Sequence, residues 1–127
     1  MKLSKNFNKR EFNSKDGKRM PFWVLENIKI LAVQVQIIRD ALGAPIHINS
    51  GYRSPEHNKR IGGVKNSQHI EGKAADLATR DASPFKLYNL ILQLISEGKI
   101  INGGVGIYNG FVHYDIRETP ARWDYRK

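Results

Sequence analysis

Residues 105–117 read VGIYNGFVHYDIR, and they contain the clearest structural signal in the chain. The dipeptide Asn109-Gly110 is the strongest short signal for the tight turn of a β-hairpin. After the dipeptide, apolar and polar residues alternate from Val112 to Arg117, as is typical of strands. The sequence therefore predicts two antiparallel strands, 105–108 and 111–117, joined by this turn.

The second predicted strand has two faces of different chemistry. Successive side chains of a strand point to opposite sides, and one side of this strand is apolar, with Val112, Tyr114 and Ile116. We expect that side to face a hydrophobic core. His113, Asp115 and Arg117 then share the opposite face, which makes them candidates for a functional site.

Upstream of the hairpin, the sequence predicts three helices and two further strands. Ser54-Pro55 and Ser83-Pro84 each combine an N-capping residue with a proline that suits the first helical turn. The apolar stripes of the two long helices, together with Trp23, are expected to form the core. The predicted helices span residues 21–42, 54–61 and 83–98, and the predicted strands span residues 45–49 and 74–78.

This order of elements indicates an α+β fold, with a small antiparallel sheet and helices packed on one of its faces. A chain of 127 residues is expected to form one domain, residues 1–127. We expect residues 1–20 to be a basic N-terminal arm that packs on this domain through Phe7 and Phe12. A loosely held terminus is the alternative.

The last ten residues, 118–127, form a polar tail for which no strand is predicted. Trp123 and Tyr125 are its large aromatic residues. We expect them either to pack back on the sheet or to line the mouth of a cleft.

The composition narrows the classes of function. Lys and Arg number 21 against 12 Asp and Glu, a net charge of +9 that favours polyanionic partners such as cell-wall polymer. The basic residues are scattered, so we expect no dedicated nucleic-acid site. The absence of cysteine excludes a disulfide scaffold, a cysteine nucleophile and a thiolate metal site. We also expect no membrane-spanning segment and no signal peptide, because no sufficiently apolar stretch occurs.

Two histidines and a carboxylate can hold zinc through three ligands and leave a fourth position open. His69 and Asp76 lie seven residues apart with Gly72 between them, which suits a loop that runs into a strand. The helical zinc motif His-Glu-x-x-His is absent. With His113, these residues form one possible metal site, and three solvated side chains are the alternative on spacing alone.

Several motifs occur together along the chain. Residues 48–54 read INSGYRS, residues 67–76 contain Ser-x-His-x-x-Gly-x-Ala-x-Asp, and residues 111–115 read FVHYD. With Leu3-Ser4-x-Asn6-Phe7 near the start, they resemble small phage and prophage members of the zinc D-alanyl-D-alanine carboxypeptidase family. This family includes peptidoglycan L-alanyl-D-glutamate endopeptidases and shares its fold with the hedgehog signalling domain. The resemblance covers nearly the whole chain and implies a zinc peptidase with that fold.

The resemblance also implies roles for individual residues. The metal ligands of the family fall on His69, Asp76 and His113. Arg53 matches an arginine beside the metal, where its charged fork can stabilise an oxyanion or hold a substrate carboxylate. Ser67 matches a serine that lines the substrate site.

The general base is the point where this sequence departs from the family. Several members carry an acidic residue or a histidine two or three positions before the last ligand, whereas this chain has Phe111 and Gly110 there. Asp115 is the nearest replacement. It serves either as the catalytic base or as a carboxylate that orients a ligand or pairs with an arginine. Glu71 and His57 are the reserve candidates.

We therefore expect a zinc-dependent peptidase that hydrolyses the peptidoglycan stem peptide or crosslink, as a D,D-carboxypeptidase or an endopeptidase. The alternative is a non-catalytic zinc-containing module that binds the cell wall or another partner. A nucleic-acid-binding domain would rest on the charge alone. We also expect a monomer, encoded by a phage or prophage, that stays in the host cytoplasm until it is released or carried on the virion.

Overall fold

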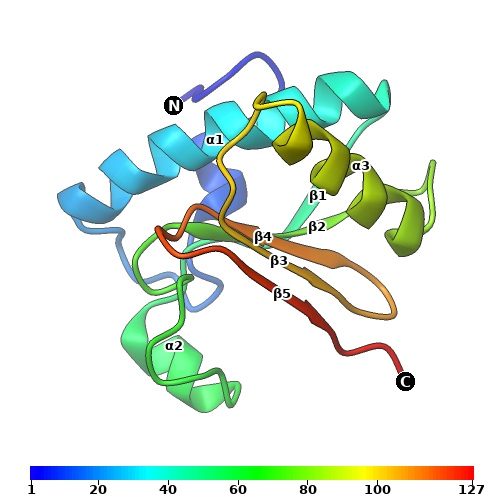
Figure 1. The fold of residues 1–127 in the computed structure, drawn as a ribbon. Helices are drawn as coiled ribbons and strands as arrows, with labels where there is room; N and C mark the ends of the chain where they lie inside the picture. Colours follow the sequence, from blue (N-terminus) through cyan, green and yellow to red (C-terminus); the bar gives the residue numbers. More distant parts are fainter.

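The computed structural model describes residues 1–127 and has one five-stranded sheet with the order β1-β2-β4-β3-β5 (Figure 1). The strands are β1 (His47–Ser50), β2 (Ala74–Ala78), β3 (Gly104–Ile107), β4 (Val112–Asp115) and β5 (Ala121–Asp124). Strands β1 to β4 pair antiparallel, whereas β5 runs parallel to β3. The predicted α+β class is confirmed, but the sheet is mixed, and the prediction of a wholly antiparallel sheet is wrong at β5.

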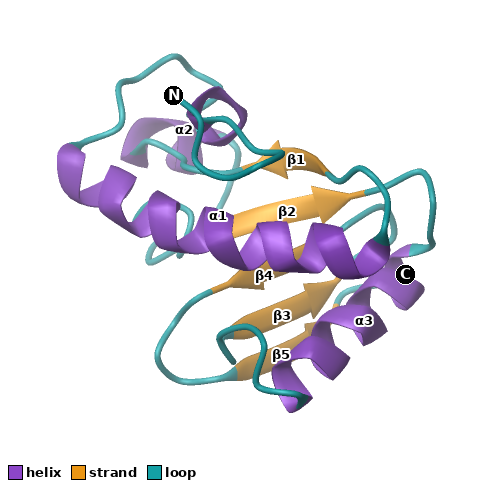
Figure 2. Cartoon of the chain, turned by 90° about the horizontal axis from the view of Figure 1, so that it is seen from above, coloured by secondary structure: helices purple, strands orange, loops and turns teal.

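Two long helices, α1 (Phe22–Leu42) and α3 (Pro84–Ser96), cover one face of the sheet (Figures 1 and 2). A 3-10 turn (Lys9–Phe12) precedes them. The short helix α2 (Pro55–Arg60) lies on the other side of the sheet, at the lower left of Figure 1. The prediction that helices pack on one face is thus confirmed for α1 and α3 and wrong for α2. None of the helices combines the length and apolar character needed to cross a membrane.

Local capping chemistry explains where the helices begin and end. The Ser54 hydroxyl accepts a hydrogen bond from the backbone N–H of His57, and the Ser83 hydroxyl accepts one from Lys86. Each of these bonds satisfies a helix donor that has no partner within its helix. Helix α1 ends at Gly43, whose φ of 73° is the left-handed conformation that glycine adopts without strain.

The core lies between the two long helices and the sheet. Phe7 and Phe12 of the N-terminal segment are buried in it and meet edge to face. Trp23 is 54% exposed, so its predicted core position is wrong. Successive helical residues point in different directions, so the side chain of Val24 faces the core while that of Trp23 faces solvent. Fully or almost fully buried side chains from α1 and the sheet include Val24, Ile28, Leu31, Ile38, Ile48, Leu77, Val112 and Tyr114.

The opposite face of the sheet carries a row of four positions from four adjacent strands. Asp76 pairs with His113, His113 pairs with Gly106, and Gly106 pairs with Trp123. Because Gly106 has no side chain, the Trp123 indole can lie across β3, where a Cβ at position 106 would overlap it. The ring centroids of Trp123 and His113 are 5.0 Å apart. Strand β5 therefore brings an aromatic side chain to the middle of this face.

Strand β5 was not predicted because residues 121–124 contain one large apolar side chain and half of their side chains are exposed. The strand forms through backbone pairing with β3, and the Tyr125 N–H extends the pairing by donating to the Ile107 carbonyl. Trp123 packs on the sheet and lines a cleft, and so fulfils both expectations for this residue.

Candidate metal centre

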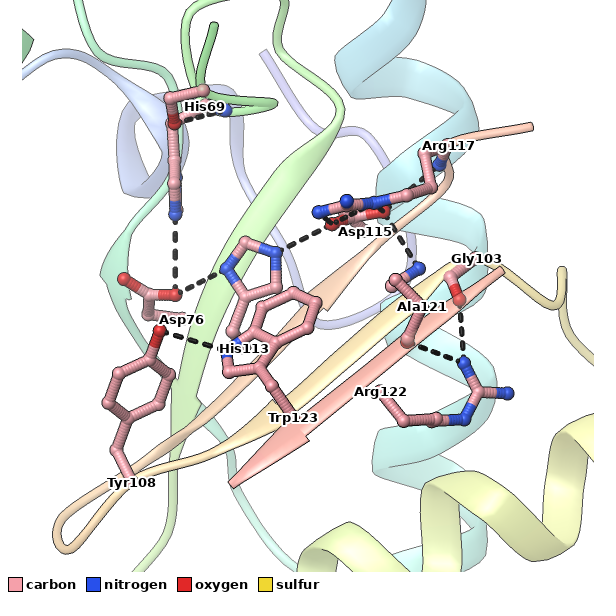
Figure 3. A network of polar contacts seen from close by, with 12 residues as sticks. His69, Asp76, Gly103, Tyr108, His113, Asp115, Arg117, Ala121, Arg122 and Trp123 are labelled. Carbon is pink, nitrogen blue, oxygen red and sulfur yellow. Dashed lines mark hydrogen bonds and ion pairs between the residues drawn. The ribbon is translucent and has the colours of Figure 1, made fainter. Parts of the chain in front are cut away.

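Three of the sequence-predicted side chains meet on the sheet face that α1 and α3 leave uncovered. His69 comes from the loop before β2, Asp76 from β2 and His113 from β4, and their polar atoms point toward one another (Figure 3). Asp76 Oδ1 lies 3.3 Å from His69 Nε2 and 3.1 Å from His113 Nδ1. All three residues are buried, and one ligand atom of each lies within 4.8 Å of the other two.

The far nitrogen of each imidazole is held by an acceptor. His69 Nδ1 lies 2.7 Å from the Gly51 carbonyl oxygen, and His113 Nε2 lies 2.7 Å from Asp115 Oδ2. A carbonyl and a carboxylate only accept hydrogen bonds, so these two nitrogens carry the hydrogens. The opposite nitrogens, His69 Nε2 and His113 Nδ1, are the ones aimed at Asp76. Metal-binding histidines are oriented in this way in proteins.

The distances from Asp76 to the two histidines suit a shared zinc ion. Zinc bonds of about 2.0–2.2 Å in a tetrahedron separate neighbouring ligand atoms by about 3.3–3.6 Å. The 3.3 Å between His69 and Asp76 and the 3.1 Å between His113 and Asp76 match that separation or fall slightly below it. Two imidazole nitrogens and one carboxylate oxygen are also a donor set that zinc accepts. The residues present therefore fit this metal.

Asp115 lies behind His113, away from the other ligand candidates, and none of its side-chain surface is exposed. Besides His113, it accepts hydrogen bonds from the backbone N–H of Gly104 at 2.8 Å and from Arg117 Nη2 at 2.6 Å. Burial alone would raise the pKa of this carboxyl, but the bonds from His113 and Arg117 outweigh it and lower the pKa below its usual value. Asp115 is thus a fully bonded carboxylate ion that pairs with Arg117 and does not contact Arg53.

The polar contacts within the centre favour the charged forms of Asp76 and His113. Burial alone would raise the pKa of Asp76, but its close polar contacts with His113 and His69 outweigh it and lower the pKa below its usual value. Burial would lower the pKa of His113, but its bonds to Asp115 and Asp76 raise it. Asp76 therefore presents a carboxylate anion to the two imidazoles.

Arg53 lies at the edge of this centre, as the sequence predicted. Its Nη2 contacts Asp76 Oδ2 at 3.3 Å, while Nε and Nη1 donate to Ser50 and Asn58. Burial lowers the pKa of Arg53, and the negative charge of Asp76 partly offsets this effect. The contacts use three of the five N–H groups of the guanidinium, which leaves two for a ligand.

A cleft opens over the three side chains between two contrasting walls. Loop residues 62–64 and 66–68 form one wall with Arg53, and within it the Ser67 hydroxyl accepts a hydrogen bond from the His69 backbone N–H. Apart from Asp76, no carboxylate lines the cleft. The other wall is aromatic and consists of Tyr108, Phe111, Trp123 and Tyr125.

The reserve candidates for the general base do not line this cleft. Glu71 points to Lys73, with 3.7 Å between the charged atoms. His57 lies on α2, and its Nδ1 is buried without a hydrogen-bond partner. His47 is exposed on β1, at a different hollow of the surface. Asp115, Glu71 and His57 all lie outside the cleft itself.

Sequence reasoning missed Tyr108 as a cleft residue. The period of two along β3 places Tyr108 on the same face as Gly104 and Gly106, and this signal could have identified it. Trp123 reaches the cleft only because β5 pairs with β3, and no local sequence pattern predicts that pairing.

Comparisons with known proteins agree with this geometry. A family model described as Peptidase M15 matches residues 5–115. A segment of 52 residues is 42% identical to the zinc D-Ala-D-Ala carboxypeptidase of Streptomyces albus G. That segment is 40% of this chain and 20% of the relative, so this chain matches about a fifth of the relative's length.

The family match extends over most of the 127 residues and includes all three side chains of the proposed metal centre. It confirms the family resemblance predicted from the sequence, and the named relative agrees with the prediction of zinc as the metal. The chain belongs to the Peptidase M15 family.

Proposed function

We propose that this chain hydrolyses peptide bonds in the stem peptide or the crosslink of peptidoglycan. The observation that carries the proposal is the cleft, which has His69, Asp76 and His113 on its floor and Arg53 at its wall. The name of the Streptomyces relative supports a D-alanyl peptide as the substrate class. A cationic cleft with no free carboxylate suits substrates that carry carboxylates of their own.

Different residues of the cleft are assigned to zinc binding and to substrate binding. We assign His69, Asp76 and His113 as the groups that hold zinc, which supplies an activated water and polarises a carbonyl when bound. Arg53 would bind a substrate carboxylate or carbonyl oxygen through its two remaining N–H groups. Ser67 lies on the same wall and is assigned to substrate binding.

For Asp115, the contacts favour the orienting role over the role of general base. The carboxylate holds His113 Nε2 at 2.7 Å and is itself held by Arg117. A general base must reach a proton on the reacting groups directly or through one water. Asp115 has no exposed surface on the cleft side, so we assign it to fixing the ring of His113.

One observation favours a second function. The cleft offers no free carboxylate to take a proton, as a non-catalytic zinc module that binds the cell wall would also show.

A phage or prophage setting, with the enzyme reaching the wall after release or on the virion, is likewise a proposal. It rests on the resemblance of the sequence motifs.

Digestion of purified peptidoglycan tests the proposed function. Wild-type protein, His69→Ala and His47→Ala are each incubated with sacculi in the presence of zinc, and the fragments are identified by mass spectrometry. His47→Ala is the matched control, because it removes an exposed imidazole outside the cleft. We expect fragments from the wild type and the control that are absent with His69→Ala.

The masses of the new ends identify the bond. Released D-alanine indicates a carboxypeptidase, and a new L-alanine end indicates an L-alanyl-D-glutamate endopeptidase. A folded, zinc-loaded wild type that yields no fragments would overturn the hydrolase proposal in favour of the binding module.

A further inference from the structure

The aromatic wall of the cleft contains an oriented hydroxyl group. The Trp123 indole N–H donates a hydrogen bond to the Tyr108 hydroxyl oxygen, with 3.0 Å between the heavy atoms (Figure 3). An indole N–H can only donate, so the phenol oxygen must be the acceptor in this pair. The Tyr108 hydroxyl donates no hydrogen bond to another group of the protein. The Tyr108 hydroxyl can therefore donate that hydrogen to a molecule in the cleft.

The position of this pair is set by the sheet and by ring stacking. The Trp123 ring lies against His113, in the space that Gly106 leaves open. The Tyr108 ring stacks on Phe111 with centroids 4.4 Å apart and planes inclined by 11°. Tyr108, His113 and Arg53 line the same cleft. The hydroxyl is thus held beside the metal centre by contacts that do not depend on a ligand.

We propose that Tyr108 is a catalytic residue whose hydroxyl donates a hydrogen bond to the carbonyl oxygen of the scissile peptide bond, and that Trp123 is the positioning residue that orients it. This inference rests on the proposed peptidase function. Negative charge grows on that oxygen when the carbonyl is attacked, and a donor already held in place stabilises it without reorganisation. Arg53 lines the same cleft and can supply a second donor to that oxygen.

Kinetics of four variants test the assignment. Tyr108→Phe keeps the stacked ring and removes only the hydroxyl, and Trp123→Phe keeps a ring against His113 and removes the N–H. We expect Tyr108→Phe to lower kcat by about 100-fold with KM changed by less than about threefold. Trp123→Phe lowers kcat less, and the double variant is no slower than Tyr108→Phe. Tyr88→Phe, on α3, is the matched control and keeps wild-type rates.

Additive losses in the double variant would overturn the positioning role, because Trp123 would then act independently of the Tyr108 hydroxyl. A purely structural role for Trp123 predicts such additivity. A Tyr108→Phe variant with wild-type kcat would overturn the catalytic role.

A binding measurement separates this inference from the choice of substrate. Acetohydroxamate carries an anionic oxygen and no feature of peptidoglycan, and its affinity for each zinc-loaded variant is measured by calorimetry. We expect Tyr108→Phe to bind it about 10- to 150-fold more weakly than the wild type and Tyr88→Phe to bind it equally. Equal affinity of Tyr108→Phe and wild type overturns the inference, as does a wild type that does not bind the probe. Weakened binding by Tyr108→Phe, together with no peptidoglycan cleavage by the wild type, rejects the proposed substrate and supports the assigned donor.

Discussion

Replacing Asp115 with asparagine separates the orienting role that we assign to this carboxylate from the role of general base. An orienting carboxylate acts on the affinity for zinc and on stability, because its partners are His113 and Arg117. A general base acts on turnover while zinc stays bound. Asparagine has nearly the same size, so the substitution changes the hydrogen bonding with little change in packing.

The structure sets the magnitude of the effect. Oδ1 accepts from the backbone N–H groups of Gly104 and Arg117, and Oδ2 accepts from His113 and the Arg117 guanidinium. An asparagine has only one acceptor oxygen. In either orientation of the amide, its NH₂ group therefore faces the donors that one of the two Asp115 oxygens satisfies. Buried donors left unpaired cost about 1–3 kcal/mol. Loss of the charge pair adds up to about 1 kcal/mol, because the Arg117 side chain is 29% exposed and screened by water.

We therefore expect Asp115→Asn to lower the free energy of unfolding of the metal-free protein by about 1–4 kcal/mol. Its zinc affinity should fall by about 10- to 100-fold, the usual effect of losing a partner of a ligating histidine. Turnover at saturating zinc should stay within about tenfold of the wild type. Urea unfolding in EDTA, competition with a zinc chelator and fragment release from peptidoglycan measure the three quantities.

Asp124→Asn is the matched control, since Asp124 pairs with Arg126 at the same two-residue spacing but on the surface. It should change none of the three quantities appreciably. The orienting role is refuted if Asp115→Asn binds zinc like the wild type and loses about 100-fold or more in turnover, which is the signature of a general base.

Three further perturbations have defined outcomes. Gly72→Ala should cost about 2–5 kcal/mol in urea unfolding, because φ is 73° and the new Cβ would lie 2.6 Å from Val24 Cγ1; a cost below about 1 kcal/mol would contradict this packing. The hydrogen bond from Ser54 holds the pKa of Asp16 well below its usual 3.8. The Asp16 carboxylate therefore stabilises the folded state fully at pH values above 3.8, and this stabilisation is lost as the pH falls through the lower folded-state pKa. The stability difference between wild type and Asp16→Asn should accordingly be constant from pH 7 to about pH 5 and shrink below about pH 4, and a difference that grows toward acid would reverse the assigned sign. Removing zinc with EDTA should lower the melting temperature of the wild type and leave that of His69→Ala unchanged, and equal shifts in both proteins would place the metal elsewhere.

Features that depend on a few neighbouring residues were predictable. Ser54 and Ser83 begin helices because their hydroxyls accept from backbone N–H groups three residues ahead, within the same turn. Strand β2 was predicted with its observed bounds, and the hairpin strands differ from prediction by one or two residues at their ends. The motif around His69 and Asp76, with His113, identified the side chains that converge in the structure, although 37 residues separate Asp76 from His113.

The helices, the hairpin and the apolar face of β4 could thus be predicted from residue order alone, because capping, turn and alternation patterns are local, and the family resemblance supplied the metal-ligand candidates. Only the tertiary structure decided that β5 joins the sheet and lays Trp123 over Gly106, seventeen positions away in the chain, and that Trp123 then reaches Tyr108. It also decided that Asp115 is enclosed behind His113 and is not open to the cleft. These features depend on pairing between segments far apart in sequence, whose backbone hydrogen bonds and packing become favourable only when the whole sheet is assembled.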